Sequence, residues 1–241
     1  MIRLAENIKD LAFLPADAFG ATIEALAITY GFNNTGFIKF YYQDDKAALS
    51  IFDGNVTLCA SDSADFEELN LFLDSAGYKS VKCEYNTMLR LGLGIDDSSY
   101  IVTYESSQRI RPDNFVDSFE LKDIYELLKE SGFPTGDYSS FKADICSRMN
   151  KGTARFGGIA ENEILLTCCF RLFEGSKSVL LGALVTNPAA RGRGLASKAV
   201  IYMTSSDKPS FLFCRNDSLL AFYSKCGFKQ YGKWAISYKE R

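Results

Sequence analysis

A short segment rich in glycine and arginine near position 190 has the residue types and spacing that bind an anion. The apolar run 179–185 leads to a turn marked by Pro188, and helical spacing begins after Gly194. This pattern predicts a strand, a loop and the start of a helix. The backbone amides of such a loop, together with the positive end of the helix, favour a phosphate or pyrophosphate. Arg191 and Arg193 carry charge of the same sign and can each hold phosphate oxygens with two hydrogen bonds.

Several phosphate-binding motifs can be compared with this loop. A dinucleotide fold needs Gly-x-Gly-x-x-Gly and an acidic residue at a strand end about 20 residues on, and the loop lacks both. A nucleotide-triphosphate loop needs Gly-Lys followed by Ser or Thr, which does not follow here. The remaining pattern, Arg191-x-x-Gly194-x-Ala196, resembles the acyl-CoA-binding signature of the GCN5-related N-acetyltransferases (GNAT). The plain alternative is a surface turn that happens to contain two Arg-Gly pairs.

The segment 216–228 resembles the same family downstream of the loop. It opens with a residue type that caps helices and closes with Gly before a hydrophobic residue, and 210–214 before it has the pattern of a short buried strand. In the family, the helix after the phosphate loop is followed by a strand and by a helix that carries Asn, Phe-Tyr and Gly-Phe. The matching residues are Asn216, Phe222, Tyr223, Gly227 and Phe228. Two motifs in the same order support the resemblance better than either one alone.

The composition of the chain restricts its partners and location. Its 241 residues suffice for two modest domains, and a formal net charge of -3 argues against nucleic acid as a partner. No apolar stretch approaches the ~20 residues of a membrane span. Charged residues within 1–10 interrupt the apolar core that a signal peptide needs. We therefore expect a cytoplasmic protein without a nucleic-acid or membrane partner, as a monomer or homodimer.

Seven cysteines and the absence of histidine limit the chemistry further. The cysteines are scattered, odd in number and without a Cys-x-x-Cys pair, which is typical of reduced, buried thiols in a cytosolic protein. A zinc site would need four ligands at a recognisable spacing, so we expect no metal. Without histidine, the Ser-His and Cys-His hydrolases are excluded.

Residues 109–241 have the order of elements expected of a GNAT N-acetyltransferase domain, an α/β fold with a mixed sheet. Besides the loop and its helix, the expected elements are helices at 117–130 and 138–149, strands at 154–159, 163–173, 178–185 and 210–214, a helix at 217–226 and a strand at 229–239. The first strand of the fold is expected either at 109–111 or near Tyr100.

Residues 1–108 carry a weaker version of the same pattern. The expected elements are strands at 37–43, 47–52 and 55–60, a helix at 65–76, and strands at 80–85 and 100–105. This order is similar to that of the second half, but Arg-x-x-Gly-x-Gly/Ala is missing. We expect a smaller, degenerate GNAT-like lobe, joined to the second half by a polar linker at 105–109.

The resemblance implies how acetyl-CoA would be bound as the co-substrate. In the family, the strand before the loop splays from its neighbour and pairs with the pantetheine arm. Leu184 and Val185 would occupy that place, and the amide near Val185 would polarise the thioester carbonyl; Thr186 is a further expected coenzyme-binding residue. For the side chains of Leu184 and Val185, core packing is the simpler interpretation. The pyrophosphate would be held by the amides of Arg191, Gly192, Arg193, Gly194, Leu195 and Ala196, and Ser197 is also expected to bind the coenzyme.

Tyr223 is the residue that the resemblance makes catalytic. Its hydroxyl would act as the general acid that protonates the departing CoA thiolate, whereas the simpler alternative is a ring packed in the core. Asn216 would either bond the pantetheine or cap its helix. We name no general base, because 178–184 contains no carboxylate. The nearby carboxylates at strand ends, where a solvated turn charge is the simpler role, are Glu161, Glu163 and Glu174.

These features predict an enzyme that transfers an acetyl group from acetyl-CoA to a primary amine by direct attack in a ternary complex. The acceptor would be a small molecule or a peptide, and aromatic residues that could line its cleft are Phe170, Phe173, Trp234 and Tyr238. Two alternatives remain open. The missing base allows a non-catalytic acyl-CoA-binding or regulatory module, and the donor motif also allows a longer acyl or an aminoacyl group.

Overall fold

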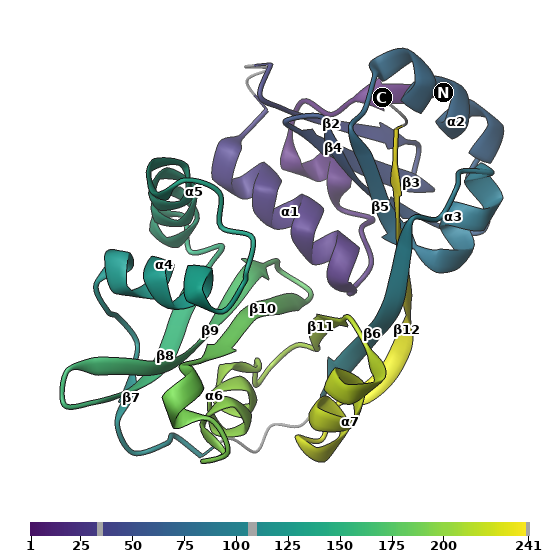
Figure 1. Ribbon diagram of the computed structural model, residues 1–241. Coiled ribbons are helices and arrows are strands. Elements are labelled where there is room, and N and C mark those ends of the chain that lie inside the picture. The colour runs from purple at the N-terminus through teal and green to yellow at the C-terminus, as the bar shows by residue number, and fades with distance from the viewer. Residues whose placement is uncertain (33–35, 106–109, 240–241) are drawn as a thin grey trace.

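A single mixed β-sheet runs through the protein in the computed structural model, which describes residues 1–32, 36–105 and 110–239 (Figure 1). Its strands are β1 (Ile2–Leu4), β2 (Ile38–Gln43), β3 (Ala47–Phe52), β4 (Asn55–Ala60), β5 (Ser80–Glu84), β6 (Asp97–Tyr104), β7 (Phe115–Val116), β8 (Arg155–Glu161), β9 (Ile164–Glu174), β10 (Val179–Thr186), β11 (Ser210–Cys214) and β12 (Lys229–Tyr238). The α-helices are α1 (Ala18–Tyr30), α2 (Phe66–Ala76), α3 (Tyr85–Leu91), α4 (Leu121–Glu130), α5 (Tyr138–Asn150), α6 (Leu195–Met203) and α7 (Asp217–Lys225). Short 3₁₀ turns occupy Ile8–Leu11 and Pro188–Ala190.

The predicted α/β class with a mixed sheet is confirmed, and most predicted elements lie within a few residues of the observed ones. Of the two places expected for the first strand of the second half, 109–111 is not supported, because residues 110–111 form no strand; the strand that precedes α4 is β7. Tyr100 belongs to β6, and α4 starts at Leu121 instead of at 117. Of the predicted linker at 105–109, residues 106–109 lie outside the described residues.

The two halves of the chain repeat one order of elements. The series β2, β3, β4, α2, β5, α3, β6 matches β8, β9, β10, α6, β11, α7, β12. In each half the third strand of the series pairs in parallel with the fourth over a short stretch. In the first half, 55–57 pair with 80–82, and in the second, 179–181 pair with 210–212. Beyond these residues both strand pairs diverge, which leaves an opening in the sheet.

The last strands of the two halves are exchanged across the middle of the sheet. The strand order is β1-β2-β3-β4-β5-β12-β6-β11-β10-β9-β8-β7. Thus β6 lies antiparallel to β11 of the second half, and β12 lies antiparallel to β5 of the first half. The division of the chain at 108/109 stays a prediction, but the sheet itself is continuous across it.

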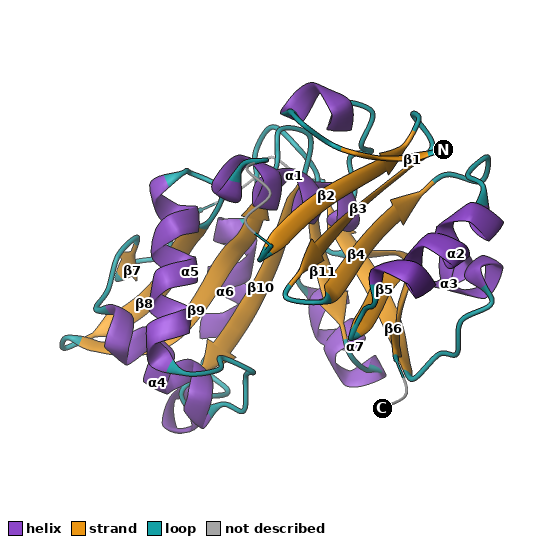
Figure 2. Cartoon of the chain, turned by 90° about the horizontal axis from the view of Figure 1, so that it is seen from above, coloured by secondary structure: helices purple, strands orange, loops and turns teal. Residues whose placement is uncertain are grey.

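Helix α1 is buried between the two halves (Figure 2). It packs against β2, β3 and β4 on one side and against β9, β10 and β11 on the other. Asp17 caps it by accepting hydrogen bonds from the amides of Phe19 and Gly20 at 2.9 and 2.7 Å. Phe19 shares a core with Phe211 of β11 and with other buried residues of both halves. Helix α1 is not among the elements predicted from the sequence.

Candidate active site

A β-bulge in β10 creates the opening between β10 and β11. The register against β9 shifts between Gly182 and Val185, and Ala183 adopts a left-handed backbone with φ of 50°. Pairing with β11 stops at Leu181. Because a bulge bends its strand and increases the local twist, β10 turns away from β11 from this point on. The splayed strand that the resemblance implied is therefore present.

The backbone after the bulge is directed partly toward β9 and partly toward the opening. The carbonyl of Val185 accepts a hydrogen bond from Thr167 Oγ1 at 2.6 Å, and Val185 pairs with Cys168 of β9. Asn187 also donates to β9, at 2.8 Å. Since successive amides of a strand point to opposite edges, the Thr186 amide, next to that of Asn187, points to the opening. Leu184 lies within the register shift and has no pairing partner on β9.

The predicted phosphate loop is exposed and joins β10 to α6. Gly192 and Gly194 have φ of 79° and 74°, a left-handed conformation that glycine adopts without strain. No side chain of the described residues caps α6, so the amides at the helix start, Leu195 to Ser197, point out of the helix without a capping partner. A Cβ on Gly192 would meet no atom within 4 Å. The space beside this backbone is therefore available to a ligand.

The two arginines of the loop are held by contacts near its base. Arg193 forms an ion pair with Glu161 of β8 at 2.6 Å, and Arg191 Nε donates to the Thr186 carbonyl at 3.3 Å. Both side chains are exposed, and each guanidinium has further N–H donors for an anion. The ion pair with Arg193 also holds the Glu161 carboxylate beside the loop.

Helix α7 holds Tyr223 at the opening. Asn216 caps the helix, because its Oδ1 accepts from the Leu219 amide at 2.9 Å. The Tyr223 ring is 5% exposed and lies beside Phe228, with ring centroids 5.6 Å apart. Within the described part of the chain, its hydroxyl has no hydrogen-bond partner. Burial, reinforced by the neighbouring cysteines, raises the pKa of Tyr223 well above its usual value, so the hydroxyl stays protonated.

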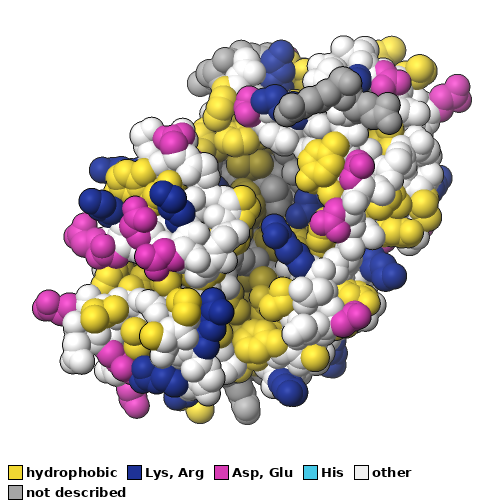
Figure 3. Space-filling view, in the orientation of Figure 1, with side chains coloured by type: hydrophobic (Ala, Val, Ile, Leu, Met, Phe, Trp, Pro, Cys, Tyr) yellow, Lys and Arg dark blue, Asp and Glu magenta, His cyan; other side chains and the backbone are white. Residues whose placement is uncertain are grey.

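A cleft of about 450 Å³ opens where β10 and β11 diverge. Leu184, Val185 and Tyr223 line it, whereas Thr186, the phosphate loop and Asn216 lie outside its lining. The rest of the lining includes the α4–α5 connection at 131–134 and a wall formed by Lys82, Asp97, Phe213, Arg215, Trp234, Ile236 and Tyr238. The space-filling view shows the molecule hollowed between its halves, with apolar side chains inside and basic ones at the rim (Figure 3).

The aromatic residues proposed for the acceptor cleft are divided between several places. Trp234 and Tyr238 line the cleft. Phe170 lines a neighbouring cavity of about 390 Å³ between β9, α4 and α5. Phe173 packs in the core around α1.

Three charged residues of the cleft were missed by sequence reasoning. Lys82 and Asp97 come from the first half of the chain, and Arg215 lies directly after β11. The Lys82 ammonium lies 3.6 Å from the ring centroid of Phe213 and 4.8 Å from that of Trp234. Burial, and secondarily the charge of Arg215, lowers the pKa of Lys82 to about 8. Because these three residues lie far apart in the sequence, no local sequence pattern indicates that they share one cleft.

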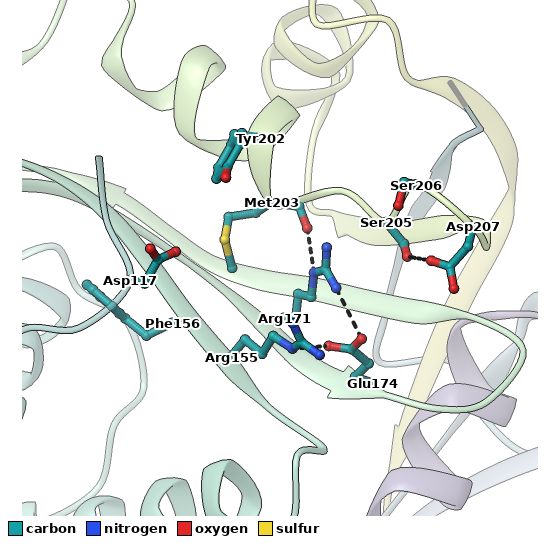
Figure 4. A pocket seen from close by; sticks show the side chains of 10 residues that line it. All are labelled: Asp117, Arg155, Phe156, Arg171, Glu174, Tyr202, Met203, Ser205, Ser206 and Asp207. Carbon is teal, nitrogen blue, oxygen red and sulfur yellow. Dashed lines mark hydrogen bonds and ion pairs between the residues drawn. The ribbon is translucent and has the colours of Figure 1, made fainter. Parts of the chain in front are cut away.

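A larger cavity of about 480 Å³ near the end of α6 is a weaker candidate for a site. Figure 4 shows that Arg155 and Arg171 are turned toward Glu174, whereas Asp207 is hydrogen-bonded to Ser205 and Asp117 lies apart from them. Arg155 and Arg171 each lie 3.1 Å from the Glu174 carboxylate, and Arg171 also donates to the Met203 carbonyl at 2.9 Å. Its charges are therefore satisfied within the fold. Glu174 is engaged here, away from the cleft.

Across 1–32, 36–105 and 110–239, no group of three or more Cys, Asp or Glu side chains could hold a metal ion. None of the helices in these ranges is long and apolar enough to traverse a bilayer.

Known proteins resemble this chain in structure. No family model and no curated protein matches the sequence. An acetyltransferase of the GNAT family from Colwellia psychrerythraea matches with a TM-score of 0.58 and 14% identity, over 99% of this chain and 100% of that chain. A tandem GNAT protein from the clavulanic acid biosynthesis pathway matches with a TM-score of 0.59 and 8% identity, over 98% of this chain and 97% of that chain. A GCN5-related N-acetyltransferase from Sphaerobacter thermophilus matches with a TM-score of 0.56 and 12% identity, over 98% of this chain and 94% of that chain.

These matches extend over nearly the whole chain, including both halves of the repeat. The protein therefore has the fold of the GCN5-related N-acetyltransferases, and it resembles a tandem GNAT protein along almost all of its length. The predicted resemblance and fold are confirmed.

Proposed function

We propose that the protein is an N-acetyltransferase that moves an acetyl group from acetyl-CoA to a primary amine. The observation that carries this proposal is the opening between β10 and β11. The unpaired edge of β10, the exposed glycine loop and the Tyr223 hydroxyl all lie beside it. The GNAT fold of its structural neighbours supports the same reaction class.

In this proposal the two edges of the opening bind acetyl-CoA. The amides at the start of α6 and the guanidinium groups of Arg191 and Arg193 hold the pyrophosphate. The backbone of Leu184, Val185 and Thr186 along the edge of the opening binds the pantetheine arm and polarises the thioester carbonyl. The carbonyl carbon then lies within the cleft near Tyr223.

The transfer needs no covalent enzyme intermediate. The neutral amine attacks the thioester carbonyl, a C–N bond forms, and the C–S bond breaks with its electron pair on sulfur. Tyr223 donates its proton to the thiolate, and the surplus proton of the amine leaves to water, from which Tyr223 is reprotonated. The buried cysteines are unsuited to be nucleophiles; burial raises the pKa of Cys168 to about 12, for example. The seven free thiols also suit the cytoplasm, where we infer that the enzyme acts.

Replacement of Gly194 by glutamate tests the coenzyme site. Gly194→Glu brings a negative charge to the proposed pyrophosphate position. We expect CoA affinity to fall by about 100-fold or more, because a charge-assisted hydrogen bond is lost and the carboxylate repels the pyrophosphate. Affinity is measured by calorimetric titration with CoA, and folding by circular dichroism. Gly77→Glu is the matched control, because Gly77 also has a positive φ, of 67°, and open space around it. Normal CoA binding by Gly194→Glu would show that the loop does not hold the pyrophosphate.

Thiol release from acetyl-CoA with a panel of amines separates an enzyme from a binding module. We expect release with at least one class of primary amine. Tight CoA binding without release on any amine would instead favour a non-catalytic acyl-CoA-binding module.

A further inference from the structure

Two cations from different halves of the chain meet in the cleft without a carboxylate partner. Lys82 is the last residue of β5 that pairs with β4, and Arg215 follows β11. Both side chains line the cleft, and the Lys82 ammonium lies 3.6 Å from the ring centroid of Phe213, two residues before Arg215. Among the described residues, neither side chain forms an ion pair within 4.0 Å, and Asp97 is the carboxylate of the same wall. Lys82 is half-buried and Arg215 is exposed. Holding a partly desolvated ammonium beside a second cation is unfavourable unless an anion joins them.

These cations lie on the face of the sheet opposite Tyr223. Phe213 packs against Phe19 of α1, with ring centroids 5.5 Å apart, so its side chain faces α1. Alternation along the strand directs Arg215 to that face as well, and Lys82 lies over the Phe213 ring. Tyr223 instead belongs to the core beneath α6 and α7. A coenzyme bound at α6 and an acceptor bound beside Lys82 therefore approach the opening from opposite faces.

Given the acetyltransferase activity proposed above, we propose that the acceptor is a small amine that also carries an anionic group, a carboxylate or a phosphate, bound by Lys82 and Arg215. Guanidinium and ammonium groups form charge-assisted hydrogen bonds with such anions. The neighbouring rings of Phe213 and Trp234 supply apolar contact for the rest of the acceptor. A cleft of about 450 Å³, shared with the end of the pantetheine, has room for a small molecule.

Matched amines test this specificity. Thiol release at saturating acetyl-CoA is measured with phenylalanine, phenylalaninamide and phenethylamine, and with O-phosphoethanolamine against ethanolamine. We expect kcat/KM to be about 10-fold or more higher for the anionic member of a set, as for one charged hydrogen bond. The set that shows the difference distinguishes a carboxylate from a phosphate.

Variants of the two cations connect that preference to this wall. Lys82→Met and Arg215→Gln should each raise KM for the anionic acceptor by about 10-fold or more, while KM for neutral amines and the affinity for CoA stay unchanged. Lys82→Arg keeps the charge and should retain most of the preference. Lys225→Met, an exposed lysine on α7, is the control.

The possible outcomes separate the two proposals. Equal use of anionic and neutral amines, or a preference that survives both Lys82→Met and Arg215→Gln, would overturn the anionic acceptor and leave the acetyltransferase proposal intact. Absence of thiol release with every amine, despite CoA binding, would overturn the acetyltransferase proposal and this inference with it.

Discussion

At the scale of single residues, the Tyr223 hydroxyl is the group that the proposed chemistry uses most directly. Tyr223→Phe keeps the ring and its packing against Phe228 but removes the only proton that the side chain can donate. We expect kcat to fall by about 10²–10⁴-fold, the usual contribution of a general acid, with CoA affinity unchanged. Thiol release and calorimetric titration measure the two quantities.

Tyr202→Phe is the matched control, because Tyr202 of α6 lies outside the cleft. Its hydroxyl accepts a hydrogen bond from the Arg111 guanidinium at 3.1 Å. If Tyr223→Phe turned over as fast as the unmodified protein, the leaving thiolate would take its proton from another donor, such as water.

At the scale of elements, the bulge of β10 controls the shape of the site. Ala183 is buried and has φ of 50°, a conformation that a β-branched side chain adopts only with strain. We expect Ala183→Val to lower the free energy of unfolding by about 1–3 kcal/mol, the usual cost of such strain, and to weaken CoA binding. Urea unfolding and calorimetric titration provide the measurements.

Ala183→Gly is the companion variant, because glycine accepts the same backbone without strain. It loses one buried methyl group, worth about 0.8 kcal/mol, and we expect a near-neutral change in stability. Equal stability and CoA affinity for Ala183→Val and Ala183→Gly would show that the bulge imposes no such demand.

The elements that the sequence predicted are those with local signals. Turns such as Asp53-Gly54, where both residues have positive φ, separate the strands of the first half, and the glycines of the phosphate loop mark the start of α6. Helix α1 gave no such signal, because Ala18–Tyr30 is apolar on nearly all sides and shows little helical periodicity. Its burial between two layers explains that composition.

The candidate site was predicted only where residues lie close together in the sequence. The loop and Tyr223 belong to motifs of the second half, whereas Lys82 becomes part of the cleft through pairing of β5 with β12. No residue pattern in either half specifies that β6 and β12 exchange places. The exchange depends on long-range strand pairing, which hydrophobic alternation alone cannot assign.

At the scale of the whole molecule, the exchanged strands make each half dependent on the other. Residues 109–241 alone would leave β12 without both neighbours, β5 and β6, and would leave one edge of β11 unpaired. Unpaired strand edges associate with other chains. We therefore expect this fragment to aggregate or to form a strand-exchanged dimer, as measured by size-exclusion chromatography with light scattering.

The intact chain under the same conditions is the control for that measurement. A folded, monomeric 109–241 fragment that binds CoA as tightly as the intact chain would contradict the dependence of the halves on each other.

The exchange of β6 and β12 also places a fluorescent side chain in the wall of the cleft. The chain has one tryptophan, and β12 carries it into the cleft wall, where its indole donates to the Cys214 carbonyl at 3.3 Å and lies near the Lys82 ammonium. Indole emission responds to nearby charge and to loss of water. Arrival of an acceptor at this wall should therefore alter the intrinsic fluorescence of the unlabelled protein, which would allow candidate molecules to be screened before any of them is known to react.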